Sequence, residues 1–282
     1  MKFQFVLLVG LAAPLVTASA AQPAALTEIP FQYREGLIWM EARMPQSPEP
    51  LNFLLDSGAG VSVISLRTAE RLKLRLGARV SVQGVDSTTT GHWPQRLLAT
   101  AGDVALPKDF LSVDLEQLSQ ACACRVDGLL GADFFRGRIV QIDFRAQKIR
   151  LLSSSNGLES QEALPLKMKH GAFTVPIEFN GGQPRWVRLD TGCAGALHWA
   201  TAETRTAQGP LRTAVALAPV SVRVSEASVK LGGIEFVAVP AELHEKQIFA
   251  GEAGLLGNGL LSRFPAVTID ARAGRLLLHR SP

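Results

Sequence analysis

Two short segments of the chain carry carboxylates in a pattern that could do acid–base chemistry. An Asp-Ser/Thr-Gly triplet occurs twice, at Asp56-Ser57-Gly58 and at Asp190-Thr191-Gly192. Two carboxylates a few Å apart cannot both ionise cheaply, so one holds a proton and the other does not. The ionised one can take a proton from water while the protonated one polarises a carbonyl oxygen, as amide hydrolysis requires. Such a pair titrates jointly, so the sequence alone gives neither carboxylate a fixed role.

A single triplet of this kind is usually a turn, in which Asp caps the backbone and Gly takes a positive φ. Here each copy follows a short run that reads as a strand, Leu51 to Leu55 or Arg185 to Leu189. Each copy is also followed by a small residue and, farther along, by the same Gly-Leu-Leu-Gly segment, at 128–131 and at 254–257. The surroundings therefore repeat together with the triplet.

The rest of the chain repeats in the same order. Ile29-Pro30-Phe31 corresponds to Leu164-Pro165-Leu166, and Ile142-Asp143 corresponds to Ile269-Asp270. Four landmarks in one order at similar spacing indicate two homologous units, and a Ser-rich stretch between them is typical of a linker. We expect a signal peptide at 1–20, an N-terminal lobe at 21–152, a linker at 153–163 and a C-terminal lobe at 164–282.

The doubled constellation resembles the pepsin and retropepsin superfamily of aspartic proteases, over essentially the whole chain after residue 20. Asp56-Ser57-Gly58-Ala59 is similar to the retropepsin active-site loop, and 128–135 with 142–143 is similar to the end of bacterial retropepsin-like domains. The resemblance implies an all-β, bilobal pepsin-like fold of two retropepsin-like β-barrel lobes with few short helices. It implies an aspartic endopeptidase acting on peptide or protein substrates, with Asp56 and Asp190 as catalytic residues in one intramolecular site of a monomer.

The resemblance also implies supporting roles. The Ser57 and Thr191 hydroxyls are expected to lock the two loops together, while Gly58 and Gly192 allow close approach. A flap over the substrate is expected at 83–93, with Gly84 and Gly91 as hinges and Trp93 as a cover. A plain exposed hairpin is the alternative there. The second unit is shorter by about eight residues between its landmarks, where surface loops vary, so a flap that does not function is one interpretation of it.

The residue after each triplet departs from the pepsin pattern. Pepsin-like enzymes carry Ser or Thr there, whereas this chain has Ala59 and Cys193. A hydroxyl would donate to a carboxylate and stabilise its charge, which Ala cannot do and a thiol does weakly. We therefore expect a less acidic working pH than pepsin's. Cys193 as a nucleophile is a weaker alternative, because no His stands near it in a recognisable motif.

Local patterns predict further elements. Helical spacing predicts a helix at 68–76, and short helices are expected at 132–136 and 259–263. Strands are expected at 80–83 and 97–104 on either side of a turn at 87–91.

Composition narrows the remaining function classes. Apolar residues make up 47% of the 282 and charged ones 19%, with a formal net charge of +4 and no basic block, so we expect no nucleic-acid partner. Lys2, an apolar run and Ala18-Ser19-Ala20 are typical of a cleavable signal peptide, which indicates an exported protein, periplasmic or secreted. The three cysteines and scattered histidines show no ligand spacing, so we expect no metal and no cofactor. A peptide-binding protein that keeps the fold without catalysis is the alternative function.

Overall fold

The computed structural model describes residues 25–85, 87–94, 96–158, 160, 162–201, 211–215 and 219–280, and the expected signal peptide lies outside these ranges. Strands dominate, and the helices of the described residues are short: α1 (Leu66–Arg71), α2 (Glu116–Ala121), α3 (Ala132–Phe135) and α4 (Asn258–Leu261). The prediction of an all-β fold with few short helices is therefore confirmed. In the part of the chain that is described, no helix is long and apolar enough to cross a membrane.

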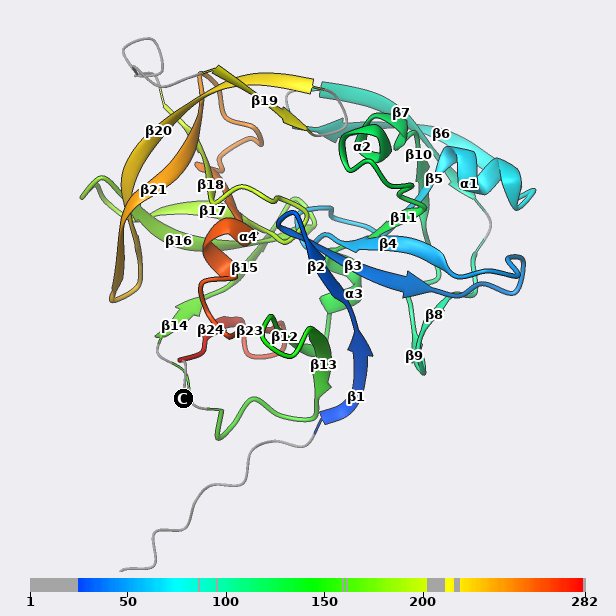
Figure 1. The fold of residues 1–282 in the computed structure, drawn as a ribbon, viewed down its shortest axis with the longest axis horizontal. Helices are drawn as coiled ribbons and strands as arrows, with labels where there is room; N and C mark the ends of the chain where they lie inside the picture. Colours follow the sequence, from blue (N-terminus) through cyan, green and yellow to red (C-terminus); the bar gives the residue numbers. More distant parts are fainter. Residues whose placement is uncertain are drawn as a thin grey trace, which may run out of the picture.

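The N-terminal half, residues 25–152, builds an eight-stranded sheet (Figure 1). Its spatial order is β2 (Gln32–Arg34), β3 (Leu37–Ala42), β4 (Leu51–Leu55), β11 (Gly128–Leu130), β5 (Val63–Ser65), β10 (Leu111–Val113), β7 (Ser87–Pro94) and β6 (Leu76–Gly84). A two-stranded ribbon, β8 (Thr100–Ala101) with β9 (Val104–Ala105), lies beside it. The strand β4 pairs in parallel with β11, so the Gly-Leu-Leu segment runs alongside the strand that ends at Asp56.

The C-terminal half, residues 162–279, builds a second eight-stranded sheet in the same order (Figure 1). The strands are β15 (Lys167–Lys169), β16 (Ala172–Phe179), β17 (Arg185–Asp190), β22 (Gly254–Gly257), β18 (Leu197–Ala200), β21 (Ile234–His244), β20 (Pro219–Leu231) and β19 (Leu211–Val215). Here β17 pairs in parallel with β22, as β4 does with β11. The repeat seen in the sequence is thus a repeat of strand order.

A six-stranded antiparallel sheet joins the halves. Its order is β1 (Ala25–Pro30), β13 (Lys148–Leu152), β12 (Ile139–Asp143), β23 (Ala266–Asp270), β24 (Arg275–Leu278) and β14 (Glu162–Pro165). The central pair, β12 with β23, comes from different halves and is in register from Ile139 opposite Asp270 to Asp143 opposite Ala266. One hydrophobic cluster runs from Ile29 in the first half to Leu278 in the second.

Three expectations about local structure were wrong. The strand expected at 97–104 is instead two short strands, β8 and β9, which pair with each other across a turn. The helix expected at 68–76 is α1, which ends at Arg71 because Lys73 takes a left-handed φ of 54° and β6 begins at Leu76. The turn expected at 87–91 is instead most of strand β7, and its hairpin turns between Gly84 and Ser87. A run of β-branched threonines favours a strand there, and this preference outweighed the turn signal.

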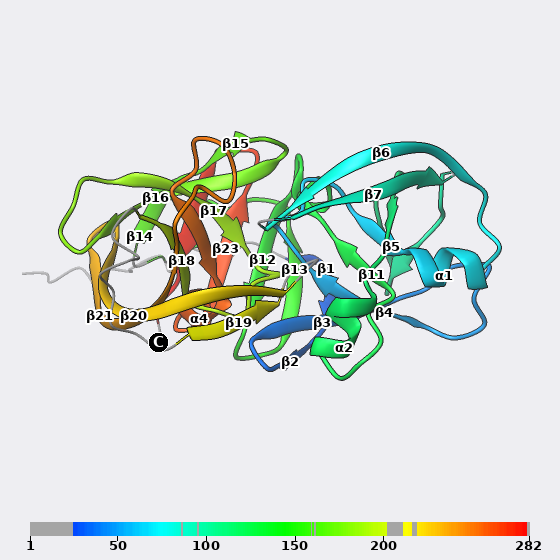
Figure 2. The ribbon, with the colours of Figure 1, turned by 90° about the horizontal axis from the view of Figure 1, so that it is seen from above.

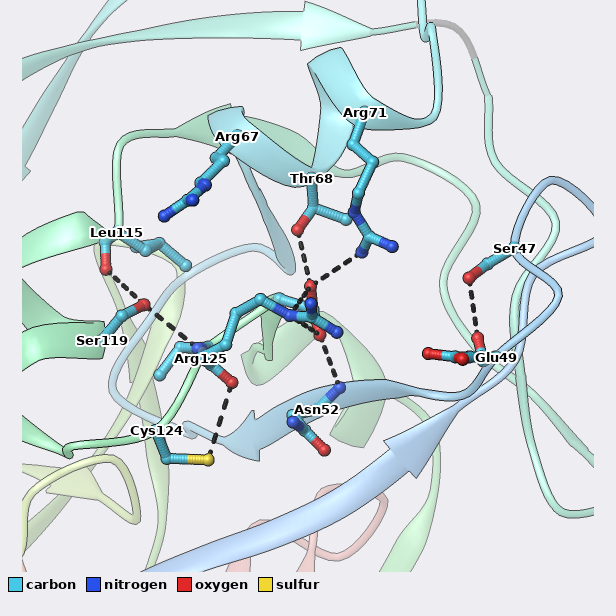
Figure 3. Close-up of polar contacts among 12 residues, drawn as sticks. Ser47, Glu49, Asn52, Arg67, Thr68, Arg71, Leu115, Ser119, Cys124 and Arg125 are labelled. Carbon is cyan, nitrogen blue, oxygen red and sulfur yellow. Dashed lines mark hydrogen bonds and ion pairs between the residues drawn. The ribbon is translucent and has the colours of Figure 1, made fainter.

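A buried carboxylate braces the first sheet away from the paired aspartates (Figure 3). Asp127 is 0% exposed and accepts hydrogen bonds from Thr68 Oγ1 at 2.7 Å, Arg71 Nη2 at 3.1 Å and the Asn52 backbone N–H at 3.0 Å. These contacts tie α1 and β4 to the segment that enters β11. The second half has Ala253 at the corresponding position, so this brace is not repeated.

Candidate active site

The two triplets meet at the centre of the molecule. Asp56 follows the end of β4 and Asp190 ends β17, so each carboxylate is placed by a strand that is fixed against a Gly-Leu-Leu strand. The backbone N–H of Asp56 donates to the Leu130 carbonyl at 2.9 Å, and Asp190 lies opposite Gly257 in the register. Both aspartates keep some exposed surface, as a site that admits water requires.

Ser57 and Thr191 exchange hydrogen bonds across the two halves. Thr191 Oγ1 accepts from the Ser57 N–H at 2.9 Å and donates to the Leu55 carbonyl at 2.9 Å. In return, Ser57 Oγ accepts from the Thr191 N–H at 3.1 Å and donates to the Leu189 carbonyl at 2.8 Å. Both hydroxyl residues are 0% exposed. The four bonds fix the two aspartates at one mutual position.

Replacing Thr191 by Val tests this lock. Val keeps the shape but leaves the Leu55 carbonyl and the Ser57 N–H without their partner, and each unpaired buried group costs ~1–3 kcal/mol. We expect the free energy of unfolding, measured in urea, to fall by about 2–5 kcal/mol. The control is Thr174→Val, since Thr174 is also buried but makes a single hydroxyl bond of 3.2 Å to Lys167 O. Equal losses in the two variants would contradict the lock.

The glycines bring the carboxyl groups within reach of one another. A Cβ on Gly58 would lie 2.4 Å from Asp190 Cγ, and one on Gly192 would lie 2.5 Å from Asp56 Cγ. Each carboxyl group lies against the glycine of the other loop, and each influences the pKa of the other. Asp56 Oδ1 accepts the N–H groups of Gly58 at 3.0 Å and Ala59 at 2.9 Å, whereas Asp190 Oδ1 accepts that of Gly192 at 2.9 Å. The loop around Asp56 thus donates one more bond to its carboxylate.

Burial and mutual repulsion hold a proton on this pair. Burial raises the pKa of Asp56 above its ordinary value. Burial and the charge of Asp56 raise the pKa of Asp190 to about 8. Because two like charges in contact cannot both form cheaply, the pair holds one proton at neutral pH. The pair formed by Asp56 and Asp190 therefore presents one carboxylate and one carboxylic acid side by side.

The environment of Cys193 corrects one expectation. His198 does lie near it: His198 Nε2 and Cys193 Sγ are 3.5 Å and 3.6 Å from the position a Cβ on Gly195 would take. The ring Nδ1 of His198 is, however, 2.9 Å from His244 Nε2, and burial together with His244 lowers the pKa of His198 to about 3. Burial and the Asp190 charge raise the pKa of the Cys193 thiol. A neutral thiol beside a neutral imidazole is a poor nucleophile.

The β6–β7 hairpin reaches from the first half to the second (Figure 2). Near its turn, Gln83 Nε2 donates to the Ile248 carbonyl at 3.4 Å. Gly84 lies at the turn opposite Ser87, and Gly91 lies inside β7 opposite Val80. Trp93 lies at the other end of the hairpin, next to Pro94, which pairs with Leu76. The structure therefore places Gly84 at the crossing end of the hairpin, and it places Trp93 at the base.

The second half has a hairpin of its own in the same place in the strand order. Strands β19 and β20 are antiparallel, and β19 lies against α2 of the first half (Figures 1 and 2). The shortening of the second unit therefore did not remove this hairpin. Within the described ranges, His, Cys, Asp and Glu side chains form no group arranged to hold a metal ion.

Three residues at the site were not identified from the sequence. Asn258 Nδ2 donates to the carbonyls of Gly36 at 2.8 Å and Thr191 at 2.7 Å. These bonds connect α4 to the loop after Asp190. Arg188 and Glu252 form a buried ion pair next to the aspartates. Aligning the two copies residue by residue would have marked Arg188, because it stands where the first copy has Leu54.

Comparison with known proteins supports the chemistry suggested by this geometry. A family described as aspartyl protease matches residues 41–134, which include Asp56 and β11. The chain is also 25% identical over 126 residues to the Retrovirus-related Pol polyprotein from transposon 412 of Drosophila melanogaster, and the match spans 44% of this chain and 10% of the polyprotein. The N-terminal half is thus similar to aspartyl proteases.

Proposed function

We propose that this protein is an aspartic endopeptidase that hydrolyses peptide bonds with a water molecule activated between Asp56 and Asp190. The observation that carries the proposal is the pair of carboxyl groups, one from each half, each lying against the glycine of the other loop and fixed by the reciprocal Ser57–Thr191 bonds. That arrangement places one base and one acid next to each other. The attack of water on an amide needs both.

The two carboxyl groups have different surroundings, which suggests their roles. Asp56 accepts two loop N–H groups and so is the better site for the negative charge. In the proposed reaction it takes a proton from water as the oxygen attacks the carbonyl carbon. Asp190, whose pKa burial and the charge of Asp56 raise to about 8, donates its proton to the carbonyl oxygen. When the tetrahedral intermediate collapses, Asp56 gives its proton to the leaving amine and a hydroxyl of the intermediate gives its proton to Asp190, so the starting protonation state returns.

The proposal includes the substrate and the location of the enzyme. A peptide chain is the expected substrate, lying beneath the β6–β7 hairpin across both halves. The first 20 residues are proposed as a cleavable signal peptide, so the working enzyme would be residues 21–282, periplasmic or secreted. We propose that one chain forms one complete site. The raised pKa values of the aspartates favour an optimum less acidic than that of pepsin.

Digestion of a defined peptide library from pH 3 to pH 8 tests the proposal. We expect residues 21–282 to cleave it, and we expect Asp56→Asn and Asp190→Asn each to lower kcat/KM by about 10³-fold or more, since each removes half of the acid–base pair. Asp103→Asn is the matched control because Asp103 is exposed and far along the chain from both triplets.

Three results would contradict parts of this proposal. Folded wild-type protein that cleaves nothing between pH 3 and pH 8 would point to the alternative, a peptide-binding protein with this fold. Cleavage that survives either substitution would mean that the two halves do not form one site. An optimum below about pH 3 would contradict the expected pH range.

A further inference from the structure

A buried ion pair lies beside the paired aspartates in the second half only. Arg188 on β17 and Glu252, just before β22, have side chains that are 4% and 1% exposed. The pair is bidentate: Arg188 Nε donates to Glu252 Oε2 at 2.8 Å, and Nη2 donates to Oε1 at 2.8 Å. Both charges are therefore removed from water and hold each other in a fixed geometry.

The first half shows that the fold does not need this pair. Arg188 lies opposite Leu255 in the β17–β22 register, and Leu54 lies opposite Leu129 in the equivalent β4–β11 register. Glu252 precedes the Gly-Leu-Leu segment by the same interval as Val126 in the first half. Leu54 and Val126 are both buried in an apolar cluster. Because burying an ion pair costs several kcal/mol of desolvation per ion that an apolar pair avoids, stability of the fold does not explain it.

The third donor of Arg188 crosses to the other catalytic loop. Its Nη1 donates to the Gly58 carbonyl at 2.9 Å. That carbonyl belongs to the same peptide group as the Ala59 N–H, which donates to Asp56 Oδ1 at 2.9 Å. A cation at one end of a peptide strengthens the hydrogen bond that the other end donates. Arg188 therefore acts on Asp56 through one peptide group.

The guanidinium is held from a second side as well. The ring of Phe249 lies 3.4 Å from Arg188 Cζ, so the cation stacks on an aromatic face. The segment that carries Phe249 and Glu252 is itself fixed, since the Glu252 N–H donates to Phe249 O at 3.0 Å and the Ala253 N–H donates to Trp186 O at 2.8 Å. Arg188 has little freedom to leave the Gly58 carbonyl.

We propose that Arg188, held by Glu252 and Phe249, is a positioning residue that fixes the Gly58–Ala59 peptide against Asp56 and places one buried positive charge beside the two carboxylates. This deepens the proposed function and rests on it for its catalytic meaning. The charge of Arg188 lowers the pKa of both aspartates, against the burial that raises them. The pair thereby retains an ionised member at a lower pH than burial alone would allow.

Other charged or titratable groups surround this arrangement and are left unchanged in the test below. On the β15–β16 turn, Lys169 Nζ donates to Gly251 O at 2.7 Å and His170 Nε2 lies 3.1 Å from Ala250 O, while Arg136 Nη2 donates to Gly60 O at 3.2 Å. On the far side of Asp190, Cys193 adjoins Glu242 and His198.

The test replaces the ion pair with the residues of the first half. The double variant Arg188→Leu with Glu252→Val keeps the net charge and uses an apolar pair that this fold already holds, so we expect it to fold. Carboxyl ¹³C NMR titration, assigned with Asp56→Asn and Asp190→Asn, gives the midpoints of the pair without requiring catalysis. We expect the midpoints to rise by up to about one pH unit, since a nearby cation lowers a carboxyl pKa by ~1–3 units and the loss of the Glu252 charge offsets part of that rise. The acid limb of the pH–kcat/KM profile should rise with them.

The single variant Glu252→Gln is expected to shift the titration midpoints of the two aspartates in the opposite direction. It removes the neutralising charge and leaves the cation, so the midpoints should fall. The control is Arg275→Leu, which removes a cation paired with Asp270 on the six-stranded sheet and should leave the midpoints unchanged. Midpoints that do not move in the double variant, or that rise in Glu252→Gln, would overturn the inference.

The two proposals fail in different ways. If the wild-type protein cleaves no peptide but the midpoints shift as expected, the proposed function is wrong and the role of Arg188 stands. If it cleaves peptides and the midpoints and profile of the double variant match the wild type, the role of Arg188 alone is wrong.

Discussion

Gly192→Ala is expected to lower kcat/KM for peptide cleavage by about 10²-fold or more while the protein stays folded. The new Cβ would lie 2.5 Å from Asp56 Cγ and 2.7 Å from its Oδ1, far inside van der Waals contact. The cheapest relief is a rotation of the Asp56 side chain, which breaks its hydrogen bonds to the Gly58 and Ala59 N–H groups but leaves the backbone in place. That rotation moves the base off the axis shared with Asp190, and a displacement of ~1 Å costs about 10²-fold in rate.

Steady-state kinetics with circular dichroism checks this result. Gly58→Ala should behave alike, because its Cβ would meet Asp190 Cγ at 2.4 Å. The control is Gly137→Ala: Gly137 has a φ of 66° but nothing within 4 Å of its added Cβ, so it costs only the left-handed backbone strain of ~1–2 kcal/mol. Full activity in Gly192→Ala would mean that the Asp56 carboxyl group lies farther from Gly192 than the structure places it.

Gly254→Ala is expected to prevent folding, because its effect is on the sheet and not on the geometry of the active site. Its Cβ would lie 1.8 Å from the His198 carbonyl oxygen and 2.8 Å from the carbonyl carbon, both backbone atoms. Because β22 is paired with β17 on one side and β18 on the other, neither neighbour can withdraw without breaking its ladder. We expect a loss of about 4–5 kcal/mol or more in the free energy of unfolding, comparable with the total stability of many domains.

Urea unfolding, or the soluble yield if no folded protein is obtained, measures this loss. Gly137→Ala again serves as the control, since it changes the same residue type without a contact. A Gly254→Ala protein with a near wild-type unfolding midpoint would show that β18 and β22 are farther apart than the register places them.

The parts of the fold that the sequence predicted are those that appear twice. Each triplet ends a strand, and each Gly-Leu-Leu segment lies beside that strand, so internal comparison located the centre of the molecule without other information. The lock between Ser57 and Thr191 was expected from the resemblance to the pepsin and retropepsin superfamily, not from the residues alone. The geometry agrees with that expectation.

What could not be predicted depends on single residues and on long-range contacts. The end of α1 depends on the left-handed backbone of Lys73, and Lys is not a residue that normally signals that conformation. The position of the hairpin turn depended on register, which threonines and glycines specify weakly. Arg188 in an otherwise alternating strand reads as an exposed side chain, and its burial follows from Glu252, which lies far along the chain.

The six-stranded sheet has a consequence for how the two copies can diverge. Its strand order reads alike from either edge, with a first strand, a last strand and a penultimate strand from each half. Two separate identical chains could build such a sheet, but equivalent positions of the two halves would then always carry the same residue. With both copies on one chain, one half can carry a charge at 188 while the other half keeps a leucine at the equivalent position, 54. The joined sheet thus frees each half of a symmetric scaffold to specialise on its own.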